Sequence, residues 1–171
     1  KESWLSSEYS NPEQIVKAVH LIYEHIMIPV AELGIPVHVI CIAGNHDRYG
    51  VERIMNKIGK EYLSYTIYKL IESLVKNQDK SNLFTFDIPE HCYTTYKLFD
   101  KDEYLYEHLH FLKGSPTEKN LTTHLMNRSA QVGRKLSGLR GGHFHSAHVF
   151  GQGKFIINGS VCGNDYYTEA I

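Results

Sequence analysis

Residues 36–48 read PVHVICIAGNHDR, an apolar and largely β-branched run that ends in a glycine and four polar residues. The run from 36 to 43 is typical of a β-strand that is buried on both faces, as strands of parallel sheets are. Gly44 then allows the chain to turn sharply away from the sheet. Because α/β folds bind ligands at the carboxyl ends of their strands, we expect residues 45–48 to lie in a functional site.

The rest of the chain alternates between helical and extended patterns. Apolar residues at helical spacing predict a helix over 12–32, which begins at Asn11-Pro12 and ends at Gly34. A second helical pattern covers 51–76, and Gly59 is expected to divide it. The further expected elements are strands at 83–87, 93–99 and 104–111, a helix that is capped by Ser115 or Thr117 and ends near 135, a strand–turn–strand passage at 138–149 and a strand at 155–158. Helices interleaved with buried strands predict a layered α/β or α+β domain.

Length and composition narrow the class of protein. The 171 residues favour one domain, and 42% apolar with 22% charged residues is an ordinary globular balance. The opening residues do not read as a signal peptide and no apolar run has membrane-spanning length, so we expect no membrane association. Three cysteines are too few for a disulfide scaffold, and this usage suits a reducing cytoplasm. The net charge of −1 lacks the basic footprint of tight nucleic-acid binding, whereas 11 histidines point to metal ligands or acid–base groups.

The polar residues 45–48 have the groups that phosphate chemistry needs. Asn45 offers a neutral oxygen to a metal ion and an N–H to an anionic oxygen. His46 can donate a proton to a leaving group, and Asp47 can hold the second ring nitrogen and orient the imidazole. Arg48 can contact phosphate. The same four residues also suit an ordinary turn with helix-capping side chains, so this stretch alone leaves both interpretations open.

Two histidines follow a pair of glycines in Gly141-Gly142-His143-Phe144-His145. On an extended backbone, His143 and His145 point to one face and Phe144 points the other way, into the core. Two imidazoles on one face make half of a metal site. Two surface or hydrogen-bonded histidines are the alternative interpretation.

A further pair, His108 and His110, ends an apolar and aromatic run that begins at Tyr104. If this strand continues to Phe111, both imidazoles share one face and His108 lies near its end. A ligand role and a structural role are equally compatible with His108, and His110 is more typical of an ordinary neighbour. The other histidines fit structural or solvent-exposed positions; they are His20, His25, His38, His91, His124 and His148.

Three motifs in this order resemble a known family. Gly-Asn-His-Asp at 44–47, a strand-terminal His108 and Gly-His-x-His at 142–145 are similar to the carboxyl-terminal motif set of the calcineurin-like metallophosphoesterases. The resemblance implies a four-layer α/β/β/α sandwich and two divalent transition-metal ions (Mn, Fe, Zn or Ni) that activate a water for in-line attack on a phosphate ester. The implied roles are metal ligands Asn45, His108 and His143 for one ion and His145 for the other, catalytic residues Asn45, His46 and Asp47 with His46 as the acid, and substrate contacts from Asn45, His46 and Arg48.

The sequence departs from the family pattern in two places. The residue after His108 is usually glycine in the family and is Leu109 here, so His110 stays open as the ligand in its place. The family's Asp-x-His and Gly-Asp-x-x-Asp motifs, which supply carboxylate ligands, do not occur before Asn45. We therefore expect residues 1–171 to form a single metallophosphoesterase domain whose first strands precede Lys1.

The tail at 156–166 resembles the endings of phage- and plasmid-encoded family members, which favours a phosphodiesterase. The expected substrate of the protein is DNA or a nucleotide. The resemblance extends to the branch of the family that contains the DNA-repair nucleases. A module that binds metal or nucleic acid without catalysis is the second hypothesis. A partner subunit of a phage replication or repair assembly is the third, and a homo-oligomer is compatible with each of them.

Overall fold

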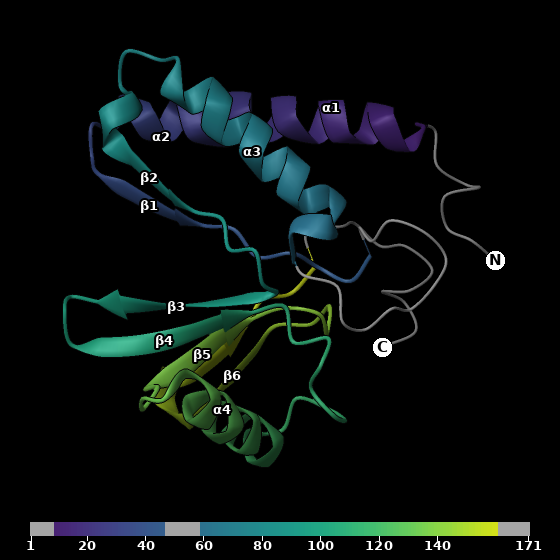
Figure 1. Ribbon diagram of the computed structural model, residues 1–171, viewed down its shortest axis with the longest axis vertical. Helices are drawn as coiled ribbons and strands as arrows, with labels where there is room; N and C mark the ends of the chain where they lie inside the picture. Colours follow the sequence, from purple (N-terminus) through teal and green to yellow (C-terminus); the bar gives the residue numbers. More distant parts are fainter. Residues whose placement is uncertain (1–8, 47–58, 161–171) are drawn as a thin grey trace. The chain divides into compact units, whose positions relative to one another are not determined.

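The computed structural model describes residues 9–46 and 59–160, and in these ranges the chain is a mixed α/β protein with two sheets (Figure 1). It divides into two compact units, one of residues 1–41 and 47–90 and the other of residues 42–46 and 91–171. Asp47, Arg48 and Cys162 lie outside the described residues, as does the beginning of the helix expected over 51–76. Among the helices in the described ranges, none is long and apolar enough to cross a membrane.

The helix expected over 12–32 is present, but a wider turn interrupts it. Pro29, in the first turn after the interruption, has no N–H to donate to the preceding turn, and a π-helical segment directly before it accommodates this. Ser10 is the N-cap in place of the expected Asn11, and its hydroxyl and backbone N–H both donate to the Glu13 carboxylate. The segments are α1 (Asn11–Ile22), η2 (Tyr23–Met27) and α2 (Ile28–Glu32).

The first unit contains a two-stranded parallel sheet with helices on one side (Figure 1). Val19 of α1 packs against Ile71 and Val75 of α3, and these residues form the buried core of this unit. A short 3-10 turn begins at Gly59, where the second helix was expected to divide, and the helix after it begins at Leu63; the part expected before Gly59 lies outside the described residues. The remaining elements of this unit are β1 (Val37–Ile40), η3 (Gly59–Glu61), α3 (Leu63–Lys76), η4 (Ser81–Leu83) and β2 (Phe84–Asp87).

The strand expected over 36–43 differs from its prediction in length and burial. It is β1, which covers only four residues, and all four are half-buried instead of buried on both faces. Cys41 and Ala43 beyond its end are the buried positions. The apolar run is therefore longer than the strand that it forms, and its last residues already belong to the segment that leads to Asn45.

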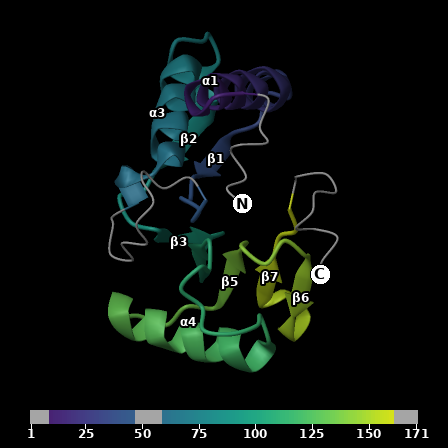
Figure 2. The same ribbon diagram turned by 90° about the vertical axis from the view of Figure 1, so that its right-hand side faces the viewer.

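The second unit is a five-stranded sheet with one helix packed on one face (Figures 1 and 2). The strand order is β3-β4-β5-β7-β6, in which the central pairs are parallel and the two outer pairs are antiparallel. Thr117 caps the helix as expected, because its hydroxyl accepts from the Asn120 N–H. The elements are β3 (Tyr93–Leu98), β4 (Asp102–Glu107), α4 (Glu118–Val132), β5 (Gly138–Gly141), β6 (His148–Phe150), η5 (Gly151–Gly153) and β7 (Phe155–Ile157).

The core of this unit lies between the central strands and α4. Leu105, Leu139 and Phe155 on the strands are fully buried, and they form one cluster with Leu121 and Leu125 of the helix. Burying side chains of this size stabilises the fold by roughly 1.5–3 kcal/mol each. This core fixes β4 and β5 side by side, and the residues that follow the two strands therefore emerge at one edge of the sheet.

Candidate functional site

Three segments that are distant in the sequence meet at one edge of the five-stranded sheet. The last residues of β4 and β5, Glu107 and Gly141, are partners in the parallel register. His108 follows the first of them directly, and His143 follows the second after one more glycine. Asn45 reaches the same place from the segment 42–46, which belongs to this unit. The edge is the one at which parallel sheets bind ligands.

The side-chain oxygen of Asn45 is the centre of the arrangement. Asn45 Oδ1 accepts a hydrogen bond from His108 Nε2 at 2.8 Å and a second one from His143 Nδ1 at 3.2 Å. The sequence separations are 63 and 98 residues, so only the tertiary fold joins these groups. The ring centroids of His108 and His143 lie 5.2 Å apart. All three side chains are half-buried.

Three more histidines surround this centre. His46 and His145 face each other with ring centroids 6.1 Å apart, and His46 is exposed to solvent. The ring centroid of His110 lies 5.7 Å from that of His108 and 3.9 Å from that of Phe111, with the Phe111 ring tilted by 41°. The structure therefore brings together Asn45 and every histidine of the three motifs, while Asp47 and Arg48 lie outside the described residues.

The backbone that presents the histidines is not the extended one that the sequence suggested. The strand expected over 104–111 ends at Glu107, and the residue after His108 is left-handed, with φ 71° at Leu109. His143 and His145 also have left-handed backbones, with φ 81° and 61°. The expectation that each pair shares one face of a strand is therefore wrong.

These left-handed residues explain how the motif histidines are aimed. Such a backbone costs a residue with a side chain roughly 1–2 kcal/mol, and strain of this kind gathers at functional sites. Leu109 adopts this backbone with its side chain fully buried, and the burial offsets the strain. The expectation for Phe144 is confirmed, since it packs against the core cluster.

The electrostatic environment keeps two of the imidazoles neutral. Burial, together with repulsion of a positive charge by the neighbouring histidines, His143 first, lowers the pKa of His108 to about 4. Burial likewise lowers the pKa of His143, with His46 and His145 adding to the effect. A neutral imidazole retains a nitrogen lone pair at pH 7, which is the state that binds a metal ion.

The distances around Asn45 also suit a metal ion. Two donor atoms bound to one ion at about 2.0–2.1 Å lie roughly 2.8–3.4 Å apart for angles between 90° and the tetrahedral value. The separations of 2.8 Å and 3.2 Å from Asn45 Oδ1 to the two ring nitrogens fall in this range. Binding requires each ring proton to move to the other nitrogen, to Nδ1 in His108 and to Nε2 in His143. Asn45, His108 and His143 thus fit a transition-metal ion that prefers nitrogen and neutral oxygen ligands.

The carboxylate half of a two-metal centre has no counterpart in the part of the chain that the structure describes. There, no group of three or more His, Cys, Asp or Glu side chains is arranged to hold an ion. The donors that converge are two imidazoles and one carboxamide. The ring of His145 lies beside that of His46, with the centroids 6.1 Å apart.

Sequence reasoning missed one buried ionic group next to the site. Glu107 is 1% exposed, and its carboxylate accepts from His124 and Arg128 of α4. The structural role expected for His124 is confirmed. Two signals in the sequence pointed to this group: an acidic residue in a buried strand position, and a histidine and an arginine one helical turn apart.

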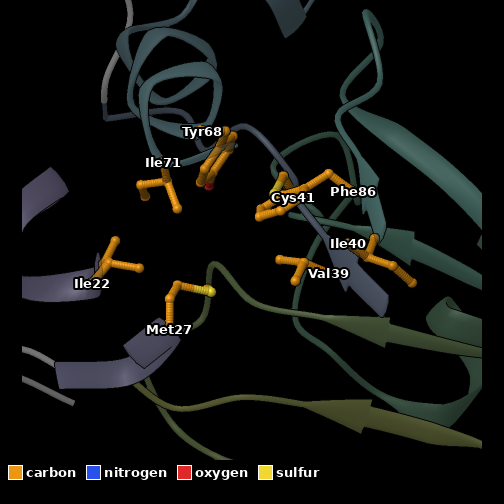
Figure 3. A pocket seen from close by; sticks show the side chains of 8 residues that line it. All are labelled: Ile22, Met27, Val39, Ile40, Cys41, Tyr68, Ile71 and Phe86. Carbon is orange, nitrogen blue, oxygen red and sulfur yellow. The ribbon is translucent and has the colours of Figure 1, made fainter. Parts of the chain in front are cut away.

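A cavity in the first unit is a separate feature (Figure 3). It measures about 120 Å³, and apolar side chains of α1, η2, β1, β2 and α3 line most of it. Burial, together with the charges of Asp87 and Glu72, raises the pKa of the Cys41 thiol in its wall to about 12. A protonated thiol is a poor nucleophile. The residues that line the cavity are therefore apolar side chains, Tyr68 and a protonated thiol.

Known proteins add nothing to this description, because the chain matches no family model, no curated protein and no solved structure.

Proposed function

We propose that the protein is a metal-dependent phosphoesterase that hydrolyses a phosphodiester. One observation carries the proposal: Asn45 Oδ1, His108 Nε2 and His143 Nδ1 come together from three segments at distances that suit one ion. The order of the motifs supports it, and we propose with it the four-layer α/β/β/α sandwich that the family resemblance implies. DNA or a nucleotide is the proposed substrate, and Mn, Fe, Zn or Ni the proposed metals.

The residues of the cluster divide the chemistry between them. A bound divalent ion polarises the phosphate and lowers the pKa of a water molecule that attacks it. Asn45 can bind the ion through Oδ1 and still donate its amide N–H to a phosphate oxygen. His46 is solvent-exposed beside His145, so its imidazole can reach the leaving oxygen and give it a proton. Asp47 and Arg48 keep their proposed roles in orienting His46 and in holding phosphate.

Hydrolysis of a chromogenic substrate tests this proposal. Purified protein is incubated with bis(p-nitrophenyl) phosphate and either Mn²⁺ or EDTA. We expect hydrolysis that depends on Mn²⁺ and falls about 10²–10⁴-fold in His46→Ala, the usual contribution of a general acid. His20→Ala, an exposed histidine on α1, should retain full activity. Absence of metal-dependent hydrolysis, or equal activity in His46→Ala, would overturn the proposal.

A second candidate function has an observation in its favour. The three possible ligand atoms, Asn45 Oδ1 and the two ring nitrogens, include no carboxylate oxygen, and the described residues contain no group of three or more His, Cys, Asp or Glu side chains for an ion. This favours a module that binds one ion without catalysis. The number of bound ions separates the two: two ions per chain with hydrolysis support the enzyme, and one ion without hydrolysis supports the module.

A further inference from the structure

The residue directly before His108 is held by a buried ionic group on the other face of the sheet. Glu107 Oε2 accepts from His124 Nε2 at 2.8 Å and from Arg128 Nε at 3.1 Å, and Oε1 accepts from Arg128 Nη2 at 2.6 Å. We call these three residues the Glu107 clamp. The Arg128 guanidinium also lies 4.3 Å from the ring of Tyr93, which is the register partner of Glu107 on β3. The clamp thus joins α4 to the ends of two strands.

Stability alone does not account for the clamp. A buried ion pair loses its hydration, and well-packed apolar side chains in its place are often as stabilising or more so. Leu105 and Leu109, two residues before and two residues after Glu107, are apolar and fully buried in one core cluster. An ion pair with three hydrogen bonds also fixes the orientation and the position of the groups that it joins. Here it fixes Glu107, the last residue of β4.

The same strand carries a second clamp that serves as a control. Glu103 is 9% exposed, accepts from Arg134 Nε at 2.9 Å and 2.7 Å, and accepts from the Thr95 hydroxyl at 2.6 Å. We call this group the Glu103 clamp. Glu103 lies four positions before Glu107 on the strand, a distance of about 13 Å. The Glu103 clamp therefore fixes β4 at the end that is remote from the histidines.

We propose that Arg128 and His124 are positioning residues for His108. They act through Glu107, because fixing the end of β4 fixes the imidazole of His108 against Asn45. The expected effect of these residues on metal affinity rests on the proposed function. Their expected effect on the 2.8 Å hydrogen bond between His108 and Asn45 does not, because this bond exists without an ion.

Two matched variants test the proposal with two readouts. Arg128→Met breaks the Glu107 clamp, and Arg134→Met breaks the Glu103 clamp. The first readout is the ¹H–¹⁵N signal of the His108 ring in metal-free protein at pH 7. The second is the dissociation constant for Zn²⁺ from calorimetry. We expect Arg128→Met to shift the ring signal and to weaken Zn²⁺ binding about tenfold, the low end for residues behind a ligand. Arg134→Met should leave the His108 ring signal unchanged and should change the dissociation constant for Zn²⁺ by less than about twofold.

The outcomes separate this proposal from the proposed function. If the wild-type protein binds no Zn²⁺, the metal site fails, and the ring signal alone still decides whether Arg128 positions His108. If Zn²⁺ binds and Arg128→Met leaves both readouts unchanged, or Arg134→Met alters them equally, the positioning role is overturned. His124→Leu removes only one of the three hydrogen bonds and serves if Arg128→Met does not fold. It should change both readouts in the same direction by a smaller amount, and no change would overturn the proposal.

Discussion

The left-handed backbone at Leu109 leads to a prediction that departs from a usual rule of protein stability, namely that replacing a buried alanine by glycine is clearly destabilising. Leu109 is fully buried, has φ 71° and follows His108 directly. Shortening a buried leucine to alanine destabilises a protein by about 2–5 kcal/mol. A further change from alanine to glycine normally destabilises it again, by about 0.5–1 kcal/mol from chain entropy and by the loss of one more buried carbon. At Leu109 the same change also relieves about 1–2 kcal/mol of left-handed strain.

Leu105 provides the comparison that isolates the strain. It is fully buried in the same core, but it lies within β4, where the backbone is extended. The entropy and burial contributions of the alanine-to-glycine step are similar at both positions, so they cancel in the difference. We predict that the step is more favourable at position 109 than at position 105 by about 1–2 kcal/mol.

Urea denaturation followed by circular dichroism measures this difference. The four variants are Leu105→Ala, Leu105→Gly, Leu109→Ala and Leu109→Gly, and the free energy of unfolding is extrapolated to water for each. If the alanine-to-glycine step is equal at the two positions within about 0.5 kcal/mol, Leu109 is not strained. The account of how the turn aims His108 would then be wrong.

Three further predictions concern the surroundings of the site. A Cβ added at Gly141 would lie 2.5 Å from Leu109 Cδ1, so Gly141→Ala should lower the free energy of unfolding by about 1–3 kcal/mol through overpacking; an unchanged urea midpoint would contradict this. The pKa of His108 is about 4 in the folded protein against 6.5 for the free group, so the unfolded chain takes up this proton first. The free energy of unfolding of the metal-free protein should therefore fall by up to about 3 kcal/mol as the pH falls from about 6.5 to about 4. Urea titrations at pH 7 and pH 4 should show a decrease that is smaller by about this amount in His108→Asn than in the wild type. Thr117 caps α4 through the Asn120 N–H, so Thr117→Ala should reduce the stability by about 1 kcal/mol, which thermal unfolding would show.

Much of the secondary structure could be predicted from local patterns. The start of α4 followed from Thr117, one of the two expected caps, and the helical course of the segment after Ser10 followed from its apolar spacing. These features depend on the preferences of single residues and on apolar spacing, which a sequence displays. The end of β4 could not be predicted in the same way, because Leu109 favours continuing the strand and only its burial offsets the left-handed turn.

The candidate site shows the same division. Its residue types were evident from the motifs, because Asn45 and the histidines occur in a recognisable order. Their arrangement was not, since the backbone at His143 and His145 is left-handed instead of extended. The hydrogen bond of His143 to Asn45 spans 98 residues, a contact that no local pattern encodes. The clamp on Glu107 likewise depends on how α4 packs against the sheet.

The most direct test of the account is the metal content of the purified protein and of three variants. Wild type, Asn45→Ala, His108→Ala and His143→Ala are dialysed against Mn²⁺ and Zn²⁺, and the bound ions per chain are measured by mass spectrometry of the elements. We predict at least one ion per chain in the wild type and a loss of that ion in each variant, while His20→Ala keeps it. A wild type without bound metal, or variants that retain it in full, would contradict the claim that Asn45, His108 and His143 form a metal site.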